Sequence, residues 1–433
     1  MRSLLRKALP AVINLCMASN IFINVNAAEI KNQQVENQAE VFYHLFQRSF
    51  YDTNGDTHGD LNGIVSKLDY LQDLGVTSLL LLPLYPSIYH HNYFAASFEG
   101  IDAEYGDMND YITMVESIHN RGMKFYMDTE IQYATENHPW FKDSRNNPAS
   151  PYSEYIIYRD KENKEPETTI FDITHLQSHD GINADITTVS LNSPKVKKYM
   201  RELFTFWVDP NKDGDFSDGV DGFRIDHMMD DLDEKGILTN LLTNFWAPLF
   251  KQLKAINPRL KIIGEQADWT HYGDEYFEKA DVDMTFGFAI REGLISLDKA
   301  LIEKNTKATF AATPADKNQL LLLENHDLPR FATVVKSHPG KMRIAAAYLM
   351  LSEGVPLVYY GQELGMEGLG GIGKESSSFA DANDKTQSTN NDWDSAKVPS
   401  ASDLKKLWTP SKTPPLMMAR TFLFAKRLSG TVR

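Results

Sequence analysis

Eight apolar stretches with β character recur along this sequence, and amphipathic stretches separate them. The amphipathic stretches include 64–74, 108–121 and 195–207, where apolar residues recur at helical spacing. Strand–helix alternation repeated eight times predicts a parallel (β/α)8 barrel, a TIM barrel of the α/β class. An open doubly wound sheet is the alternative, but no glycine-rich phosphate loop follows the first apolar stretch. The predicted strands are 41–50, 78–85, 124–131, 222–226, 261–266, 282–288, 320–327 and 356–361.

The connection between the third and fourth predicted strands is too long for a simple barrel. It holds about sixty residues with aromatic, proline and charged clusters, and insertions of this length are usually functional. We therefore expect an inserted subdomain B at 132–190, which lines one side of the barrel mouth. Trp140 within it is either a core residue or a sugar-stacking surface. The barrel is predicted at 28–131 and 191–400, and the atypical tail at 401–433 shows no strand pattern.

The first 27 residues have the pattern of a signal peptide. A basic start is followed by a mostly apolar stretch, which ends at the small residues Ala27 and Ala28. A membrane anchor is the alternative, but several asparagines interrupt the apolar stretch. Cleavage there would make the protein secreted or periplasmic. It would also remove Cys16, the only cysteine, so we expect no disulfide in the mature chain.

Composition narrows the possible partners. The chain of 433 residues is 42% hydrophobic, enough for a large core, and its formal net charge is −15. No block of Lys and Arg is present that would hold a phosphate backbone, which argues against nucleic acid. An acidic surface suits a neutral, polyhydroxylated substrate. We expect a monomer with no membrane contact once the signal peptide is cleaved.

Three of the predicted strands end in a carboxylate: Asp226 in DGFRID, Glu265 in IIGEQ and Asp327 in LLLLENHD. A carboxylate at the end of an apolar strand is costly to desolvate unless it is paired or used. The carboxyl ends of TIM-barrel strands face the active site, so the three groups should meet there. Arg224 lies two residues before Asp226, on the same face of its strand, where it would keep Asp226 ionised. Glycoside cleavage requires paired carboxylates, one as nucleophile and the other as acid and then base.

These segments resemble the catalytic strands of the α-amylase family of glycoside hydrolases, and the similarity runs from about Val41 to Gly365. The resemblance implies retaining hydrolysis of α-glucosidic bonds in starch-like α-glucans or maltooligosaccharides, through a covalent glycosyl-enzyme. It assigns the nucleophile to Asp226, the general acid/base to Glu265 and transition-state stabilisation to Asp327. The substrate-binding residues that it implies are His91, Tyr93, Tyr133, Arg224 and His326. The usual C-terminal β-sandwich domain of the family has no counterpart in the tail.

Three positions near the implied site depart from the family pattern. Gln132 and Tyr133 stand where the family usually has Asn, a calcium ligand, and His, a sugar contact. Phe94 stands where many members carry an acidic residue. Asp128 is retained, and we interpret it as a structural partner of Arg224.

The sequence from Asp52 to Asp60 offers oxygen ligands at alternate positions, with glycines for a tight turn, and predicts a hard-cation site. A solvated acidic turn is the alternative. By resemblance the cation is a structural Ca²⁺ or Mg²⁺, and no organic cofactor is expected. A second acidic loop, 209–218, has similar spacing but Val220 at its twelfth position, so metal binding there stays open. The ligands implied at the first loop are Asp52, Asn54, Asp56, the His58 carbonyl and Asp60.

The same catalytic residues would also serve an α-glucan transferase or an α-glucosidase. The sequence does not separate hydrolysis from transfer, endo from exo action, or α-1,4 from α-1,6 linkages. A truncated, non-catalytic glucan-binding protein is a third reading, which the tail favours and the intact carboxylate trio opposes.

Overall fold

The computed structural model describes residues 40–56, 58–178, 181–266 and 272–368 of the chain. The predicted signal peptide at 1–27 and the tail at 401–433 lie outside the described residues. The prediction that the tail forms no β-sandwich domain concerns these same residues.

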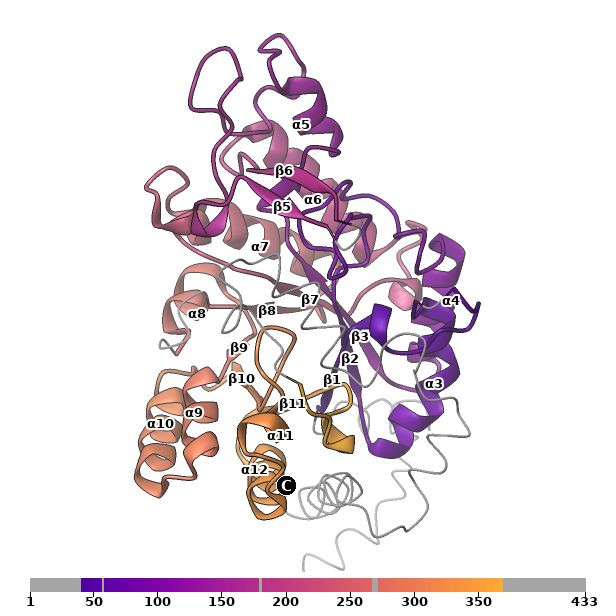
Figure 1. The fold of residues 1–433 in the computed structure, drawn as a ribbon, viewed down its shortest axis with the longest axis vertical. Coiled ribbons are helices and arrows are strands. Elements are labelled where there is room, and N and C mark those ends of the chain that lie inside the picture. The colour runs from indigo at the N-terminus through magenta and orange to yellow at the C-terminus, as the bar shows by residue number, and fades with distance from the viewer. Residues whose placement is uncertain (1–39, 57, 179–180, 267–271, 369–433) are drawn as a thin grey trace, which may run out of the picture. The chain divides into compact units, whose positions relative to one another are not determined.

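In the described residues, eight parallel strands close into a barrel (Figure 1). Each strand pairs with its neighbours in chain order, and β1 closes the barrel against β11. The predicted TIM barrel is therefore confirmed. Six of the eight predicted stretches contain a whole strand, and the last two strands begin two residues and one residue before the stretches predicted for them. The strands are β1 (Phe42–Leu45), β2 (Ser78–Leu81), β3 (Lys124–Thr129), β7 (Gly222–Ile225), β8 (Lys261–Gly264), β9 (Met284–Phe286), β10 (Asn318–Leu322) and β11 (Val355–Tyr359).

The strands are shorter than predicted because their apolar sequence continues into the loops at the barrel mouth. The first stretch, predicted at 41–50, leaves the barrel after Leu45 and turns through a short 3-10 helix, η1 (Gln47–Ser49). These loops are buried nearly as deeply as the strands, so hydrophobicity alone does not mark where pairing ends.

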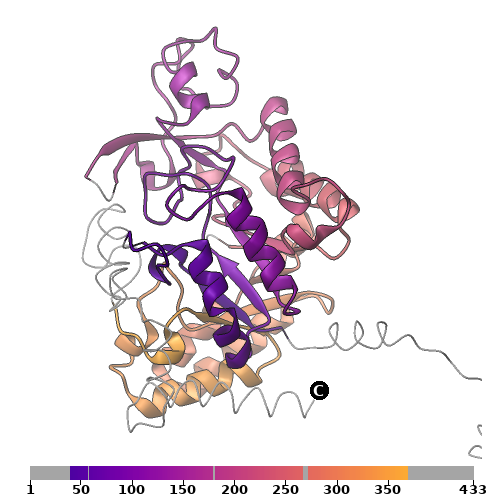
Figure 2. The same cartoon turned by 90° about the vertical axis from the view of Figure 1, so that its right-hand side faces the viewer.

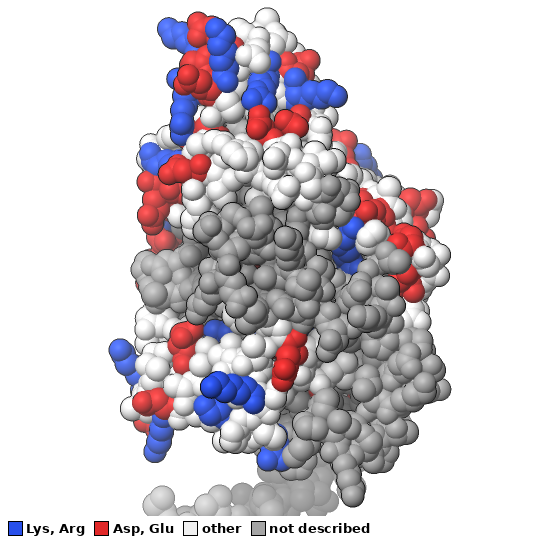
Figure 3. All heavy atoms as spheres, in the orientation of Figure 1, with Lys and Arg blue, Asp and Glu red and all other residues white. Residues whose placement is uncertain are grey.

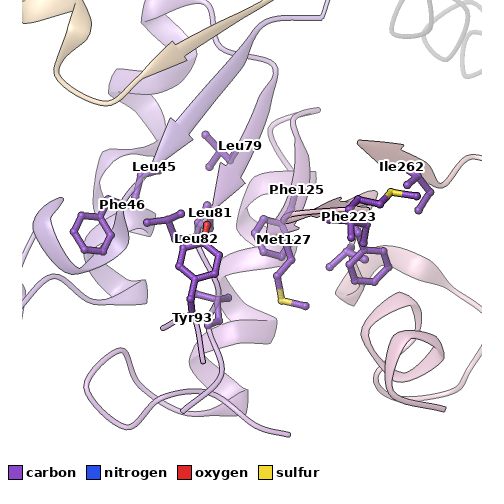
Figure 4. Close-up of a cluster of buried hydrophobic side chains, with 14 of the residues drawn as sticks. Leu45, Phe46, Leu79, Leu81, Leu82, Tyr93, Phe125, Met127, Phe223 and Ile262 are labelled. Atoms are coloured by element: carbon purple, nitrogen blue, oxygen red, sulfur yellow. The ribbon is translucent and has the colours of Figure 1, made fainter. Parts of the chain in front are cut away.

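Alternate side chains of each strand face the barrel interior or the surrounding helices. The interior holds a separate apolar cluster that includes Phe42, Leu80, Tyr126 and Ile263. Gly222 begins β7 beside this cluster, and a Cβ on it would meet the Tyr126 ring at 2.5 Å. The outward side chains belong to the larger core, and Figure 4 shows ten of its residues. They are Leu45, Phe46, Leu79, Leu81, Leu82, Tyr93, Phe125, Met127, Phe223 and Ile262.

Helices cover the outside of the barrel, and local sequence signals mark their ends. Asp60 caps the first of them, α3, through a bond from the Gly63 N–H, and Gly75 ends it with a φ of 94°. Figures 1 and 2 both show α3 beside α4, with which it packs. The helices are α3 (Leu61–Leu74), α4 (Met108–His119), α5 (Pro139–Ser144), α6 (Pro194–Val208), α7 (Ala247–Ile256), α8 (Asp274–Ala280), α9 (Phe288–Ser296), α10 (Lys299–Ala311), α11 (Phe331–Val334) and α12 (Pro339–Leu351). Shorter turns are η2 (Ile170–Asp172), η3 (Phe216–Asp218), η4 (Leu232–Glu234), the π-helical η5 (Leu242–Trp246) and η6 (Gln362–Leu364).

The insertion after β3 carries its own three-stranded antiparallel sheet, in the order β4 (Tyr133–Thr135), β6 (Asn183–Thr188) and β5 (His175–Gln177). It lies at the top of Figure 1, where Figure 3 shows basic and acidic side chains interspersed. Trp140 is only 4% exposed and packs against aromatic rings, so the reading of it as an exposed sugar platform is wrong. The apolar side chains of the insertion, such as Trp140 and Ile186, are continuous with the larger core outside the barrel.

Among the helices of the described ranges, none is both long enough and apolar enough to cross a bilayer.

Candidate active site

Arg224 on β7 is the centre of a buried charge cluster at the carboxyl ends of the barrel strands. Its side chain is 1% exposed. Nη1 donates to both Asp128 oxygens, at 2.9 and 2.8 Å, and to Asp226 Oδ1 at 2.6 Å. Nη2 lies 2.7 Å from Glu265 Oε2, at the end of β8. One guanidinium therefore holds carboxylates from three neighbouring strands, and the interpretation of Asp128 as its structural partner is confirmed.

Tyr93 and His326 link the third predicted carboxylate to this cluster. The Tyr93 hydroxyl donates to Asp128 Oδ2 at 2.7 Å and lies 2.9 Å from His326 Nε2. The two rings are stacked, with centroids 5.5 Å apart. His326 Nε2 lies 3.3 Å from Asp327 Oδ2, and Asn325 donates to that oxygen at 2.9 Å. Asp327 is thereby joined through hydrogen-bonding side chains to Arg224.

Four carboxylates gather near one fixed cation, so the cluster favours protonation of some of them. Burial raises the pKa of Glu265 well above its usual range; Arg224 opposes the rise, and the charges of Asp226 and Asp327 add to it. Burial likewise raises the pKa of Asp327 to about 7. A carboxylic acid that stays protonated near neutral pH is what a general acid requires.

Burial acts in the opposite direction on the histidine beside Asp327. It lowers the pKa of His326 well below its usual value, and the nearby His44 and Arg224 lower it further. His326 is therefore a neutral imidazole, which can donate one hydrogen bond and accept another.

The residues that depart from the family pattern tie the end of β3 to other loops. Gln132 Nε2 donates to the backbone oxygens of Asp226, at 2.5 Å, and His227, at 3.1 Å. The Tyr133 hydroxyl donates to Asp233 Oδ1 at 2.5 Å. Gln132 thus binds the backbone of the predicted nucleophile, and Tyr133 binds the loop that follows it.

His91 is a buried residue that contacts Tyr89 and Tyr93. It is 2% exposed, its Nδ1 accepts from the Tyr93 N–H at 3.1 Å, and its ring stacks on Tyr89 at 5.7 Å. In this structure His91 fixes the segment that carries Tyr93. Its predicted contact with a sugar stays a prediction.

The loop after β1 has the turns expected of an oxygen-rich cation loop. Asp52 Oδ1 accepts from the N–H groups of Asn54 and Gly55, Asn54 Oδ1 from Asp56, and Asp56 Oδ1 from His58. Asp60 is engaged as the cap of α3 and accepts from Thr53 as well. The exposed oxygen set fits a hard cation in composition. No three acidic, His or Cys side chains in the described ranges converge as a ready-made metal site, so the ligands would include Asn54 and backbone oxygen.

Two acidic residues of the site, Glu130 and Asp233, were not predicted from the sequence. Glu130 is 1% exposed and accepts from the N–H groups of Phe94, at 2.6 Å, and Tyr133, at 2.8 Å. Glu130 directly follows β3, which ends at Thr129, so its position at a strand end was an available signal. Asp233 carried no such signal, because its partner Tyr133 lies 100 residues away in the sequence.

Comparison with known proteins agrees with this geometry. A model of the alpha-amylase catalytic domain matches residues 44–412, most of the chain. The chain belongs to the alpha-amylase family. This confirms the resemblance inferred from the sequence.

Individual members of the alpha-amylase family are similar over most of this chain. Alpha-amylase 3 of Dictyoglomus thermophilum is 29% identical over 338 residues, which cover 76% of this chain and 64% of that protein. Oligo-1,6-glucosidase of Parageobacillus thermoglucosidasius is 29% identical over 385 residues, covering 75% and 65%. The crystal structure of alpha-amylase from H. orenii has a TM-score of 0.70 and 25% identity, covering 91% of this chain and 83% of that one. The chain spans slightly less than two thirds of the length of these two curated relatives.

Proposed function

We propose that this alpha-amylase family member is a retaining glycoside hydrolase that cleaves α-glucosidic bonds of starch-like α-glucans or maltooligosaccharides. The observation that carries the proposal is the arrangement of Asp226 and Glu265 on either side of the Arg224 guanidinium, with Asp327 alongside. The names of the relatives, an alpha-amylase and an oligo-1,6-glucosidase, support an α-glucan substrate.

In the first step Asp226 attacks the anomeric carbon and the Glu265 carboxyl gives its proton to the leaving glycosidic oxygen. Arg224 Nη1 lies 2.6 Å from Asp226 Oδ1 and holds this carboxylate in place for the attack. The charge of Asp226 is one cause of the raised pKa of Glu265. Bond formation removes that charge, so the pKa of Glu265 falls and the same group becomes the base that activates water in the second step.

Asp327 lies beside His326, whose Nε2 is 3.3 Å from Asp327 Oδ2. We assign to Asp327 the stabilisation of positive charge that develops on the sugar ring. The neutral His326 and the Tyr93 ring beside it would bind the same sugar, with His91 and Tyr133 completing that side. The backbone bond from Gln132 to Asp226 holds the nucleophile in place.

The proposal also covers a structural metal site, the oligomeric state and export. The loop after β1 would hold a structural Ca²⁺ or Mg²⁺ through Asp52, Asn54, Asp56, the His58 carbonyl and Asp60. A bound cation there would cross-link the loop and supply no reacting group. We further propose a monomer, exported by the signal peptide at 1–27.

Product analysis on maltoheptaose tests the proposal. Wild-type protein should release shorter maltooligosaccharides whose new reducing ends are α-anomers when first observed by NMR, and Asp226→Asn should release none. Initial β-anomers would overturn the retaining assignment. No cleavage by folded wild-type protein, together with glucan binding, would favour the non-catalytic reading instead.

The name of the oligo-1,6-glucosidase relative specifically favours a second candidate, an α-glucosidase with the same catalytic residues. Glucose and maltohexaose as the only early products would support it. Products longer than maltoheptaose would instead show a transferase, and pullulan would report on α-1,6 cleavage.

A further inference from the structure

The loop Asp209–Asp218, between α6 and β7, crowds four aspartates at the end of the barrel away from the candidate active site. It precedes β7, whereas Asp226 follows the same strand. In the described part of the chain, no Lys or Arg forms a salt bridge with Asp209, Asp213, Asp215 or Asp218. The four aspartates outnumber Lys212, the one basic residue of the loop, so the loop carries net negative charge.

The backbone of this loop winds around its own side-chain oxygens. Asp209 Oδ2 accepts from the Gly214 N–H at 3.1 Å, Asn211 Oδ1 from Asp213 at 2.9 Å, and Asp213 Oδ1 from Asp215 at 2.7 Å. Gly214 makes the turn with a φ of 81°. Twelve-residue calcium loops use side-chain oxygens at positions 1, 3 and 5, a glycine at 6 and a backbone oxygen at 7. Counted from Asp209, this loop has that pattern.

A buried carboxylate without a partner gives a second and independent indication. Asp218 is 2% exposed, and neither of its oxygens forms a hydrogen bond; Asp209 Oδ1 is also buried without one. Burial raises the pKa of Asp218, and the charges of Asp209 and Asp213 add to the rise. A carboxylate buried against other carboxylates is costly unless a cation joins them.

Asp218 can replace the acidic ligand that is missing from the twelfth position of this loop. The twelfth position, Val220, lacks the acidic ligand that closes such loops, but Asp218 offers two carboxylate oxygens from position ten. The Tyr111 hydroxyl is also buried without a hydrogen bond; burial raises its pKa, and the charge of Asp218 adds to the rise.

We propose that Asp209–Asp218 is a second cation site, which binds Ca²⁺ through Asp209, Asn211, Asp213 and Asp218 side chains and the Asp215 backbone oxygen. An oxygen-only set drawn from a flexible loop suits Ca²⁺ better than the smaller, strictly octahedral Mg²⁺. In the described residues, no group of three His, Cys, Asp or Glu side chains converges closely enough to hold a metal ion, and this loop is no exception. Cation binding would therefore draw its carboxylates together by side-chain rotation. The bound ion would fix the start of β7, the strand that carries Arg224.

Terbium luminescence tests the site directly in the full-length protein. Tb³⁺ replaces Ca²⁺ in oxygen sites and is excited by nearby aromatic rings, and Tyr111 and Trp207 lie 5.2 Å apart beside this loop. Wild-type protein should show emission that Ca²⁺ displaces. The first loop follows Tyr51 and would also bind Tb³⁺, so the comparison is made in the Asp56→Asn background, which weakens that site. In this background Asp213→Asn, at an exposed position, should weaken the emission at least tenfold, while the exposed Asp316→Asn should leave it unchanged. Equal emission with and without Asp213→Asn would overturn the proposal.

Thermal unfolding of Asp218→Asn provides the second measurement. With EDTA this variant should melt at or above the wild-type temperature, because it loses an unpartnered buried charge. With Ca²⁺ it should melt below wild type, because it loses a ligand. The same difference from wild type in both conditions would show a purely structural role for Asp218 and overturn the proposal. Neither measurement needs a glucan, so the result is independent of the proposed hydrolase activity.

Discussion

Asp327→Asn should abolish turnover and yet stabilise the protein, most strongly at alkaline pH. Burial raises the pKa of Asp327 from 3.8 to about 7 in the folded protein. The folded state therefore prefers the protonated form, and the stability that this group contributes at low pH is lost as the pH rises through about 7. Asparagine is neutral at every pH, has nearly the same shape and can still accept the hydrogen bond from Asn325.

The size of the effect follows from the pKa difference of about three units, at about 1.36 kcal/mol per unit. The upper limit is about 4 kcal/mol at pH 8. We halve it, because the charge of Arg224 opposes the rise and Asp327 keeps 16% of its side-chain exposure. The variant should be more stable than wild type by about 2 kcal/mol at pH 8 and by less than about 1 kcal/mol at pH 5.

Guanidinium chloride unfolding, followed by tryptophan fluorescence at pH 5 and pH 8, measures this advantage. The matched control is Asp316→Asn, an exposed carboxylate in the loop before β10, which should match wild type at both pH values. A lower stability of Asp327→Asn at both pH values, or an advantage that does not change with pH, would refute the reasoning. The expected result would mean that the carboxylate is retained at the expense of stability, as a functional group.

Two further predictions concern other parts of the molecule. Tyr133→Phe breaks the bond to Asp233 and should raise KM for maltoheptaose several-fold with kcat changed by less than about twofold; loss of kcat at constant KM would instead place Tyr133 in the chemical step. Asp56→Asn should reduce the rise in melting temperature that Ca²⁺ gives over EDTA; an identical rise would count against a cation in the first loop.

The barrel could be predicted because its signal is local and repeated. Each strand is a short apolar run, and the helix after it carries its own amphipathic period and end signals, such as Asp60 and Gly75 around α3. Strand ends could not be predicted in the same way. Burial at the barrel mouth continues beyond the last paired residue, so the same apolar sequence runs from strand into loop.

The candidate site could be predicted in outline for a related reason. Asp226 and Glu265 each follow a barrel strand, and Arg224 shares the strand face of Asp226, so topology alone brings them to one mouth. The reading of Trp140 as a possible platform failed because exposure depends on what the rest of the insertion covers. Composition and spacing do not contain that information.

The sequence by itself determined the class of fold, the family and the identity of the three strand-end carboxylates, because these depend on short-range pattern and strand order. Only the tertiary structure decided how those carboxylates share charge. It placed one guanidinium among Asp128, Asp226 and Glu265, joined Tyr133 to Asp233 across 100 residues, and buried Asp218 without a partner. Burial and the charges contributed by distant strands set the protonation of each group, so these properties appear only once the barrel is closed.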